Sequence, residues 1–504
     1  MRRLIANKMK KSFLLLLTSS LLLLVFLFFW FHPTIPLMSD ESEYLRNAYL
    51  LTQGITGYSD EEFAYGFVGS DDRFFSRYPL TASIFIVPFL VGGLNTIFLF
   101  GLFFFLLGFF FFYKLLQENK LSPWWSFLYF GYLPFLYHAT TLMMDLPSMA
   151  LVLGAFYFYV KKKHGFCGIF LGLATLVKST NFLAAIVIGV FILINIVKKK
   201  EKVCSLLKLV LGTVPFLIIL LLHNWHVYGD FLGSGYFFIH NNFQFLFGHE
   251  NASGLYFGNL FRYFLFLNVF YPGMLILAFL SKYSLRKEAI AYALLSLLFF
   301  SSVNAIVKLD PLNLISMYRF IFPIIPLLFI GYAHFFEQSV FSRFKKMKKH
   351  FGKIMLLCCV LSLVAFVPLF DLKSQGSSRS EKIITDIYAN TVNDSLIIGV
   401  QEGNYFSELF GVRGYVGILR PVGFENGELV AENKTIEYLK NGKKVYVLYL
   451  DTPNYSYKSG ISETKAVLDN IRNEHGSNLV YEKSYMIGNI FYNSEISVQL
   501  FELG

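Results

Sequence analysis

The sequence predicts an all-α polytopic membrane bundle of roughly eleven transmembrane helices, followed by a small C-terminal α/β domain on the outer side. The first reason is composition: of the 504 residues, 55% are hydrophobic and only 15% are charged, whereas a soluble domain is usually about 25% charged. The second is that many apolar runs approach or exceed the roughly 20 residues that cross a hydrocarbon core. The third is a change of composition after residue 370, where these runs stop.

The first apolar run, residues 12–31, is long, and no small-residue cleavage site follows it. We therefore interpret it as an uncleaved anchor. An outer loop, residues 32–78, comes next. The short apolar stretch 79–92 is interrupted by prolines and glycines, which favours a helix lying at the outer surface. The remaining spans are predicted at residues 94–113, 121–138, 146–160, 165–178, 181–197, 205–222, 261–280, 288–306, 319–337 and 353–370.

The basic residues indicate the orientation. The net charge is +11, and the Lys and Arg residues gather in short clusters between apolar runs, which is typical of cytoplasmic loops. The N-terminus is therefore predicted inside and the C-terminal domain outside, in a multi-pass protein of the cell membrane (or of the endoplasmic reticulum membrane in a eukaryote). No cluster has the interleaved aromatics of a single-strand binding groove, so nucleic acid is not an expected partner. The clusters are Arg2–Lys11, Lys161–Lys163, Lys198–Lys202, Lys282–Lys287 and Arg343–Lys353.

The segment 165–197 lies between two of these clusters, so it must cross the membrane an even number of times. Two short helices fit, with their apex near "LVKSTN". This parity places Lys178 on the outer side, level with Asp40.

Residues 1–370 thus form the predicted transmembrane domain, with 32–78 as its outer catalytic loop, and residues 371–504 form the predicted α/β domain, which has an ordinary domain size. The domain begins with a polar stretch, "DLKSQGSSRSEK", that we interpret as a linker. The runs "SLIIGV" and "KVYVLYL" predict strands, a helical pattern covers 462–473, and a last strand is expected near 496–501. All four cysteines lie in or beside apolar runs, so neither disulfides nor a cysteine metal site are expected.

Charges outside the inner clusters are few and would be costly inside a bilayer, at about 2.5–3.5 kcal/mol each at helix-centre depth. Each has an ordinary interpretation: Asp40 and Glu41 as solvated loop residues, Asp145 as the start of a helix, Arg319 as an interfacial arginine and Lys178 as an anchor. The full set is Asp40, Glu41, Glu43, Arg73, Arg77, Asp145, Lys178, Arg262, Lys308, Asp310 and Arg319.

Together these charges place carboxylates and cations on one face of the membrane. A reaction that fits is attack on a phosphate-activated group carried by a lipid. The phosphate leaves without needing an acid, so one carboxylate suffices as general base, with Arg and Lys to hold the leaving charge.

Several segments resemble, in order, the motifs of the type-C glycosyltransferases, in particular the protein O-mannosyltransferase and aminoarabinose-transferase-like group. "DESEY" with "RNAYLLTQG" is similar to their first outer loop, and "RYPLTASIFIVPFLVGG" to a K-P-P-L segment, although Arg77, Tyr78 and Pro79 stand where the family often has Lys-Pro-Pro. The further segments are "DLPSMALVLGAFYFY", "GIFLGLATLVKSTNFLA", "NWHVYGDFLGSGY" and "YRFIFPIIPLL".

The resemblance implies an inverting transfer of a monosaccharide, as a hexosyl- or pentosyltransferase, from a polyprenyl-phosphate carrier on the outer or lumenal face. It implies that Asp40 is the catalytic carboxylate, with Glu41 beside it. Within that mechanism we assign the donor phosphate to Arg77, Lys178 and Arg319, and orientation of the acceptor to Asp145 and Tyr44.

The sequence leaves the acceptor open as a lipid, glycan or protein, in surrounding membrane lipid. No metal ligands are predicted and no cofactor is certain, although Asp145 could hold a divalent cation. A transporter or flippase of lipid-linked sugars is the first alternative, but it is expected to show repeat symmetry, which the sequence does not. A non-catalytic assembly protein would leave Asp40 and Glu41 unexplained.

Overall fold

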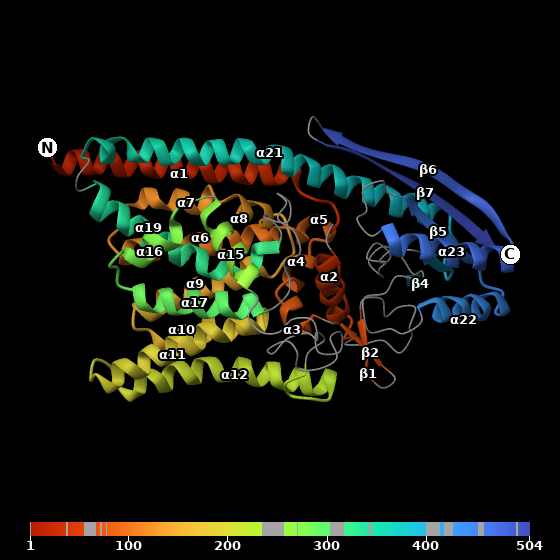
Figure 1. The fold of residues 1–504 in the computed structure, drawn as a ribbon, viewed down its shortest axis with the longest axis horizontal. Helices are drawn as coiled ribbons and strands as arrows, with labels where there is room; N and C mark the ends of the chain where they lie inside the picture. The colour runs from red at the N-terminus through yellow and green to blue at the C-terminus, as the bar shows by residue number, and fades with distance from the viewer. Residues whose placement is uncertain are drawn as a thin grey trace. The chain divides into compact units, whose positions relative to one another are not determined.

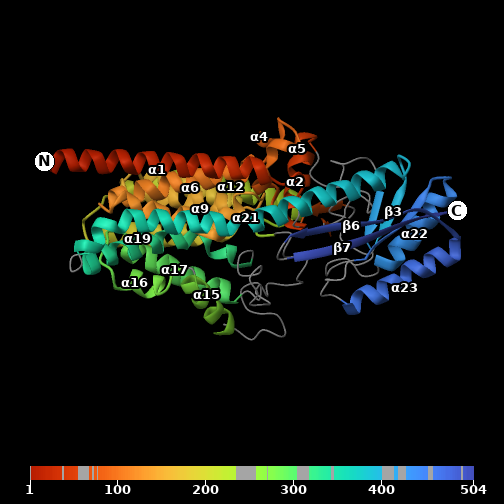
Figure 2. The ribbon, with the colours of Figure 1, turned by 90° about the horizontal axis from the view of Figure 1, so that it is seen from above.

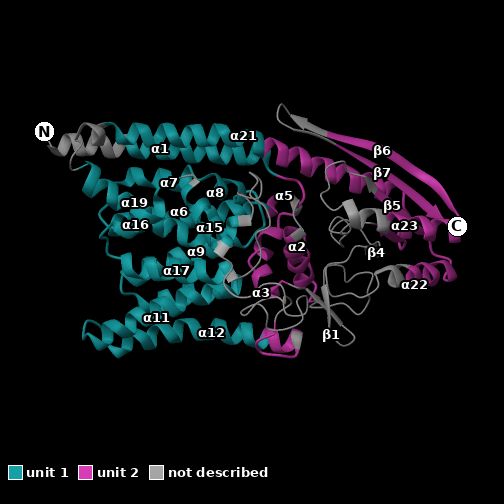
Figure 3. Ribbon diagram, viewed as in Figure 1, with its two compact units in different colours: residues 1–32, 98–222, 243–369 teal, residues 33–97, 223–242, 370–504 magenta. Residues whose placement is uncertain are grey.

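The structure is a computed structural model that describes residues 2–36, 39–54, 67–70, 73–76, 78–233, 257–269, 271–302, 317–341, 345–399, 414–417, 427–451, 458–489 and 492–504. The chain divides into two compact units (Figure 3). The helical unit consists of residues 1–32, 98–222 and 243–369, and the mixed unit of residues 33–97, 223–242 and 370–504.

The helical unit is a bundle in which the apolar runs of the sequence form helices (Figure 1). In chain order its elements are α1 (Arg2–Phe31), α6 (Leu99–Glu118), η2 (Pro123–Ser126), α7 (Phe127–Phe130), α8 (Leu133–His138), α9 (Asp145–Val160), α10 (His164–Val177), η3 (Ser179–Asn181), α11 (Phe182–Val197), α12 (Val203–Tyr228), α15 (Phe257–Val269), α16 (Met274–Leu280), α17 (Arg286–Ser302), η4 (Met317–Ile324), α19 (Ile325–Phe335), η5 (Phe336–Val340) and the start of α21 (Lys345–Ala389).

Helix α9 lies at the centre of this unit and contacts α6, α10 and η4. Most of its side chains are buried, as expected for an apolar helix that is surrounded by other helices. Helix α1 runs along the bundle beside α6 and α7 (Figures 1 and 2), where the ring of Phe13 contacts those of Tyr113 and Phe127.

Six helical stretches of the described chain are long and apolar enough to cross a membrane, which confirms the prediction of a helical membrane bundle with several spans. Helices α9 and α10 are apolar but shorter. The total of eleven spans remains a prediction. The six stretches are Phe13–Phe31, Leu99–Glu118, Ser179–Val197, Val203–Val227, Tyr318–Val340 and His350–Ala389.

Two predicted spans are wrong as single helices. Residues 121–138 form three short helices, because Gly131 ends α7 and Pro134, which has no amide hydrogen to continue a helix, stands in the first turn of α8. Residues 261–280 are divided between α15 and α16, and Gly273 at the start of α16 has a left-handed φ of 74°, a conformation that glycine adopts without strain. Run length alone did not reveal these breaks.

Glycines allow α10 and α12 to approach closely. A Cβ atom added at Gly168 would overlap the backbone oxygen of Leu209, and one added at Gly212 would overlap the backbone oxygen of Gly165. Thr213 fixes the same contact, since its hydroxyl donates hydrogen bonds to the carbonyl oxygens of Gly168 (3.1 Å) and Leu209 (2.9 Å). Small residues at a helix interface are typical of membrane bundles.

The mixed unit combines helices with two sheets. Its elements are α2 (Ser39–Thr52), the hairpin β1 (Phe67–Ser70) and β2 (Arg73–Ser76), α3 (Leu80–Ser83), α4 (Val87–Leu90), α5 (Leu94–Ile97), residues 370–389 of α21, β3 (Leu396–Gly399), β4 (Gly414–Gly417), α22 (Gly427–Lys440), β5 (Val445–Asp451), α23 (Lys458–His475), β6 (Ser477–Asn489) and β7 (Tyr492–Leu503).

The larger sheet has five strands in the order β4-β3-β5-β7-β6. Strand β3 pairs in parallel with β4 and β5, whereas β7 pairs antiparallel with β5 and β6. Alternate residues point to opposite faces: Val445 and Val447 pack with Leu468 of α23, whereas Tyr446 and Leu448 pack on the face that also holds Ile387 of α21. The sheet is therefore covered on both sides (Figure 2).

This arrangement confirms the small C-terminal domain with a mixed sheet. The predicted strands at "SLIIGV", "KVYVLYL" and 496–501, and the helix at 462–473, are all present. The predicted linker is wrong, because residues 371–382 are helical within α21. The polar residues 371–382 are part of α21, and further along this helix Ile383 and Ile387 pack on the sheet. The polar composition of the segment did not indicate a helix that covers a sheet.

Candidate functional site

The predicted catalytic acid, Asp40, lies in the first turn of α2. Carboxylates are stabilised at this end of a helix by its dipole. The Tyr78 hydroxyl donates a hydrogen bond of 2.6 Å to Oδ1 of Asp40. The ring of Tyr78 lies 4.8 Å from that of Tyr44, centroid to centroid, and Tyr44 is one turn beyond Asp40 on the same helix. The mixed unit thus brings Asp40, Tyr44 and Tyr78 together.

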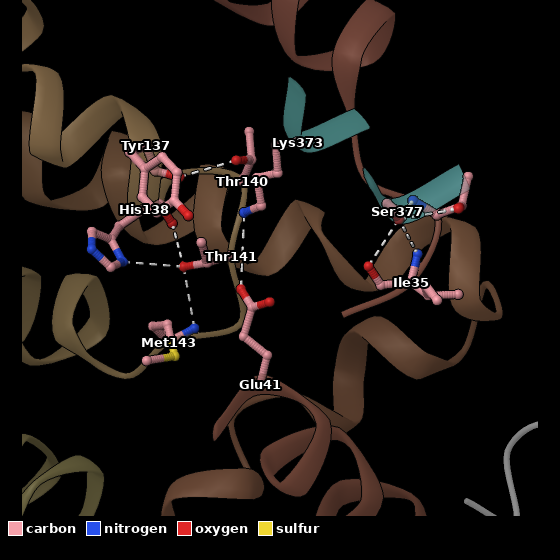
Figure 4. A network of polar contacts seen from close by, with 10 residues as sticks. Ile35, Glu41, Tyr137, His138, Thr140, Thr141, Met143, Lys373 and Ser377 are labelled. Atoms are coloured by element: carbon pink, nitrogen blue, oxygen red, sulfur yellow. Dashed lines mark hydrogen bonds and ion pairs between the residues drawn. The ribbon is translucent and has the colours of Figure 1, made fainter. Parts of the chain in front are cut away.

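Glu41, the second predicted acid, points into the protein. Its side chain is fully buried, and Oε1 lies 3.9 Å from Nζ of Lys373 on α21, which is also buried (Figure 4). One turn further along α21, Ser377 contacts the backbone of Thr34 and Ile35 ahead of α2. Asp40 and Glu41 are therefore neighbours in sequence with different environments, and only Asp40 is partly exposed.

The helical unit brings together three of the other predicted residues. Asp145 is the first residue of α9, Lys178 directly follows α10, and Arg319 lies in η4. The Lys178 Nζ atom lies 2.7 Å from Oδ1 of Asp145, and the Arg319 Nε atom lies 3.2 Å from Oδ2. Two cations and one carboxylate leave this cluster with a net positive charge.

The chain conformation around Lys178 accounts for its position. Helix α10 ends at Val177, Lys178 is extended (φ −153°, ψ 112°), and the chain turns into η3 and α11. The predicted break between two short helices at Lys178 is present. Asn181 reinforces it, since its amide donates to the carbonyl oxygen of Ala174 (2.8 Å) and its Oδ1 accepts from the hydroxyl of Ser148 (2.9 Å).

Asp145 follows a turn that is fixed by its own side chains. The Thr141 hydroxyl donates to the carbonyl oxygen of His138 (2.9 Å) and accepts from the amide of Met143 (3.3 Å), as Figure 4 shows. Helix α6 lies directly against this turn, because a Cβ atom at Gly101 would come within 2.6 Å of the Thr141 carbonyl oxygen. Buried backbone groups paired in this way hold the start of α9 in one place.

Aromatic rings cover the two cations of the cluster. The ammonium group of Lys178 lies 4.5 Å from the ring centroid of Phe320, and the guanidinium carbon of Arg319 lies 5.3 Å from the same ring. Lys178 is 21% exposed and Arg319 is 12% exposed. Both cations are therefore largely desolvated, which strengthens their attraction for an anion.

Arg77, the remaining predicted phosphate ligand, lies outside the described residues. Tyr78 and Lys373 are contacts that the sequence did not predict. Tyr78 stands in the segment that resembles the K-P-P-L motif, and this position could have indicated a role in the site. Lys373 was missed because residues 371–382 were interpreted as a linker. Among the described residues, no group of three or more His, Cys, Asp or Glu side chains could hold a metal ion.

No protein-family model matches the chain, and no curated protein does. Solved structures do match. The chain is similar to ArnT from Cupriavidus metallidurans in the apo state, with 12% identity and a TM-score of 0.62 over 97% of this chain and 98% of that one. It is also similar to the same protein bound to undecaprenyl phosphate, with 12% identity and a TM-score of 0.61 over 95% and 97% of the two chains. The resemblance to the aminoarabinose-transferase-like group is thereby confirmed at the level of the fold.

Proposed function

We propose that this protein is a glycosyltransferase that transfers a monosaccharide, with inversion, from a polyprenyl-phosphate carrier to an acceptor on the outer or lumenal face of a membrane. The observation that supports this most is the similarity, over nearly the whole chain, to a protein solved with undecaprenyl phosphate.

Asp40 is the general base in this proposal. It takes the proton from the acceptor hydroxyl or amine while the acceptor atom attacks the anomeric carbon of the sugar. The bond from that carbon to the phosphate oxygen breaks, and its electron pair leaves with the phosphate. A single displacement inverts the anomeric centre. The Tyr78 hydrogen bond holds Oδ1 and so restricts rotation of the carboxylate, and a fixed base is what a proton transfer requires.

Lys178 and Arg319 hold the charge of the leaving phosphate. Both are paired with Asp145 at 2.7 and 3.2 Å, so the carboxylate fixes two cations that would otherwise repel each other. The net positive charge of the cluster suits an anionic ligand, and charge-assisted hydrogen bonds to phosphate are strong. Because both oxygens of Asp145 contact cations, we assign Asp145 to positioning them, with Tyr44 kept as the candidate for orienting the acceptor.

The test is mass spectrometry of lipid-linked sugars and surface glycans from cells that contain the wild-type protein, no protein, or the Asp40→Asn variant. We expect a polyprenyl-phosphate sugar to accumulate, and one glycan to lose a sugar, without the protein and with the variant. Asp394→Asn is the matched control, because Asp394 is exposed and has a left-handed φ of 60° that asparagine also adopts. Unchanged lipid-linked sugars in all strains would reject a transferase, whereas Asp40→Asn behaving like the wild type would reject only the role of Asp40 as the base.

A further inference from the structure

Two side chains of α21, Lys373 and Ser377, contact the chain on either side of Asp40. We propose that they are positioning residues for the reaction proposed above, on which this inference rests, and that they fix the start of α2 so that the Asp40 carboxylate has one orientation. Both residues belong to the mixed unit, as do Thr34, Ile35 and Glu41, which they contact.

Ser377 holds the segment that leads into α2. Its Oγ accepts hydrogen bonds from the amides of Thr34 and Ile35, both at 2.7 Å, and donates to the carbonyl oxygen of Ile35 at 2.9 Å (Figure 4). Ser377 is fully buried. One hydroxyl therefore pairs with three backbone groups, two of which are buried, and the chain ahead of Asp40 is fixed to α21.

Lys373 holds the residue directly after Asp40. Its ammonium group lies 3.9 Å from Glu41, and the two side chains are 4% and 0% exposed. Lys373 and Ser377 are four residues apart, so they lie on one face of α21. The backbone is thus held before Asp40 by Ser377 and after it by the pair of Glu41 with Lys373.

Stability alone is a weak reason for a buried ion pair, since the loss of hydration offsets much of the attraction, and apolar residues of similar volume often do as well. What a charged pair adds is a defined partner. Here that partner, Lys373, lies beside the buried carboxylate of Glu41, whereas Asp40 is partly exposed. Further along the same helix, Ile383 and Ile387 pack on the five-stranded sheet. The C-terminal domain thereby contributes to holding the base.

The experiment uses the full-length protein in lipid nanodiscs, with a polyprenyl-phosphate sugar pool as donor, and measures kcat and KM for Lys373→Met, Lys373→Arg and Ser377→Ala. A base displaced by a fraction of an ångström loses rate more than binding, so we expect kcat to fall about tenfold in the Met and Ala variants, with little change in the donor KM. Lys373→Arg keeps the charge and should recover part of the loss. Matched controls are Lys382→Met, which is exposed on the same helix, and Ser378→Ala, which is half-buried beside Ser377.

A second readout separates positioning from a general loss of folding. In an Asp40→Asn background the base is absent, so Lys373→Met should cost nothing more, whereas a structural defect would add to the loss. Hydrogen exchange of residues 39–52 should speed up in Lys373→Met, because Glu41 then lacks its ion pair.

The outcomes separate this inference from the function on which it rests. If Asp40→Asn loses transfer but Lys373→Met and Ser377→Ala keep the wild-type kcat, the positioning role is wrong and the function stands. Additive losses in the double variant would also reject positioning. If Asp40→Asn itself retains wild-type turnover, Asp40 is not the base and the positioning role fails with it, while the transfer reaction stands. If the wild-type protein transfers no sugar, the proposed function fails.

Discussion

The hydroxyl of Tyr78 donates a hydrogen bond of 2.6 Å to Oδ1 of Asp40. The two residues are 38 positions apart, and Tyr78 reaches Asp40 from the segment that precedes α3. Helix α3 packs against α2. This packing holds the Tyr78 hydroxyl, which lies just before α3, within hydrogen-bonding distance of the Asp40 carboxylate. The ring of Tyr44 lies against that of Tyr78 and limits its movement.

The first prediction concerns the proposed base. Asp40→Asn keeps the shape of the side chain and removes its ability to accept a proton. Positioned general bases typically contribute about 10²–10⁴-fold to rate, so turnover should fall on that scale while the protein still inserts. Initial rates with purified protein measure this, with Asp394→Asn as the control. Near-normal turnover would place the base elsewhere.

The second prediction concerns Tyr78. Tyr78→Phe keeps the ring beside Tyr44 and removes only the hydrogen bond to Asp40. Hydrogen bonds to charged groups are worth about 1.5–3 kcal/mol, so kcat should drop about tenfold or more with the melting temperature little changed. The matched control is Tyr49→Phe, because Tyr49 is half-buried and lies on α2, the helix that carries Asp40. Equal kcat values for the two variants would show that the Tyr78 hydroxyl does not orient the base.

The third prediction concerns Lys178. If Lys178 holds the donor phosphate, Lys178→Ala should lower donor use about ten- to a hundredfold, the loss of one charge-assisted hydrogen bond. Lys178→Arg should restore part of it, but not all, because a guanidinium is wider than an ammonium. Initial rates across donor concentrations decide. Normal kinetics in Lys178→Gln would mean that Lys178 only anchors the break after α10, and would leave the phosphate to Arg319 and Arg77.

The fourth prediction tests the packing of α10 on α12. Gly168→Ala places a methyl group against the Leu209 carbonyl oxygen, a backbone atom that cannot move away without separating the helices. Overpacking of this kind typically costs about 1–3 kcal/mol, so the melting temperature in detergent should fall. Gly165→Ala is the matched control on the same helix, because its nearest neighbour would lie at 4.0 Å. Similar melting temperatures for both variants would contradict the close contact.

The fifth prediction concerns orientation in the membrane, which rests on the basic clusters. In a background without the four native cysteines, single cysteines at Gln53 and Glu432, both exposed, should react with an impermeant thiol reagent from outside intact cells. A cysteine at Lys199, exposed between α11 and α12, should react only after the cells are opened. The reverse pattern would place Asp40 on the cytoplasmic side and exclude an outer site.

The sequence by itself determined the helices that depend on local apolar run length, such as α1, α6, α11 and α12, because a bilayer sets a minimum length that can be counted along the chain. It also determined the helix break at Lys178, where polar residues interrupt an apolar run, and the strands of the C-terminal sheet, where β-branched and aromatic residues form short runs. These features need only neighbours in sequence.

Only the tertiary structure decided which charges meet. Asp145 pairs with residues 33 and 174 positions away, and Glu41 pairs with Lys373 on a helix that composition had predicted as a linker. An ion pair depends on the distance between two side chains in space. Those distances are set by how the helices pack through glycines and aromatic rings, and no periodic pattern in the sequence reports that packing. The sequence therefore identified Asp40, Asp145, Lys178 and Arg319 as unusual charges. The folded chain showed that Asp145 pairs with Lys178 and Arg319 and that Asp40 accepts a hydrogen bond from Tyr78.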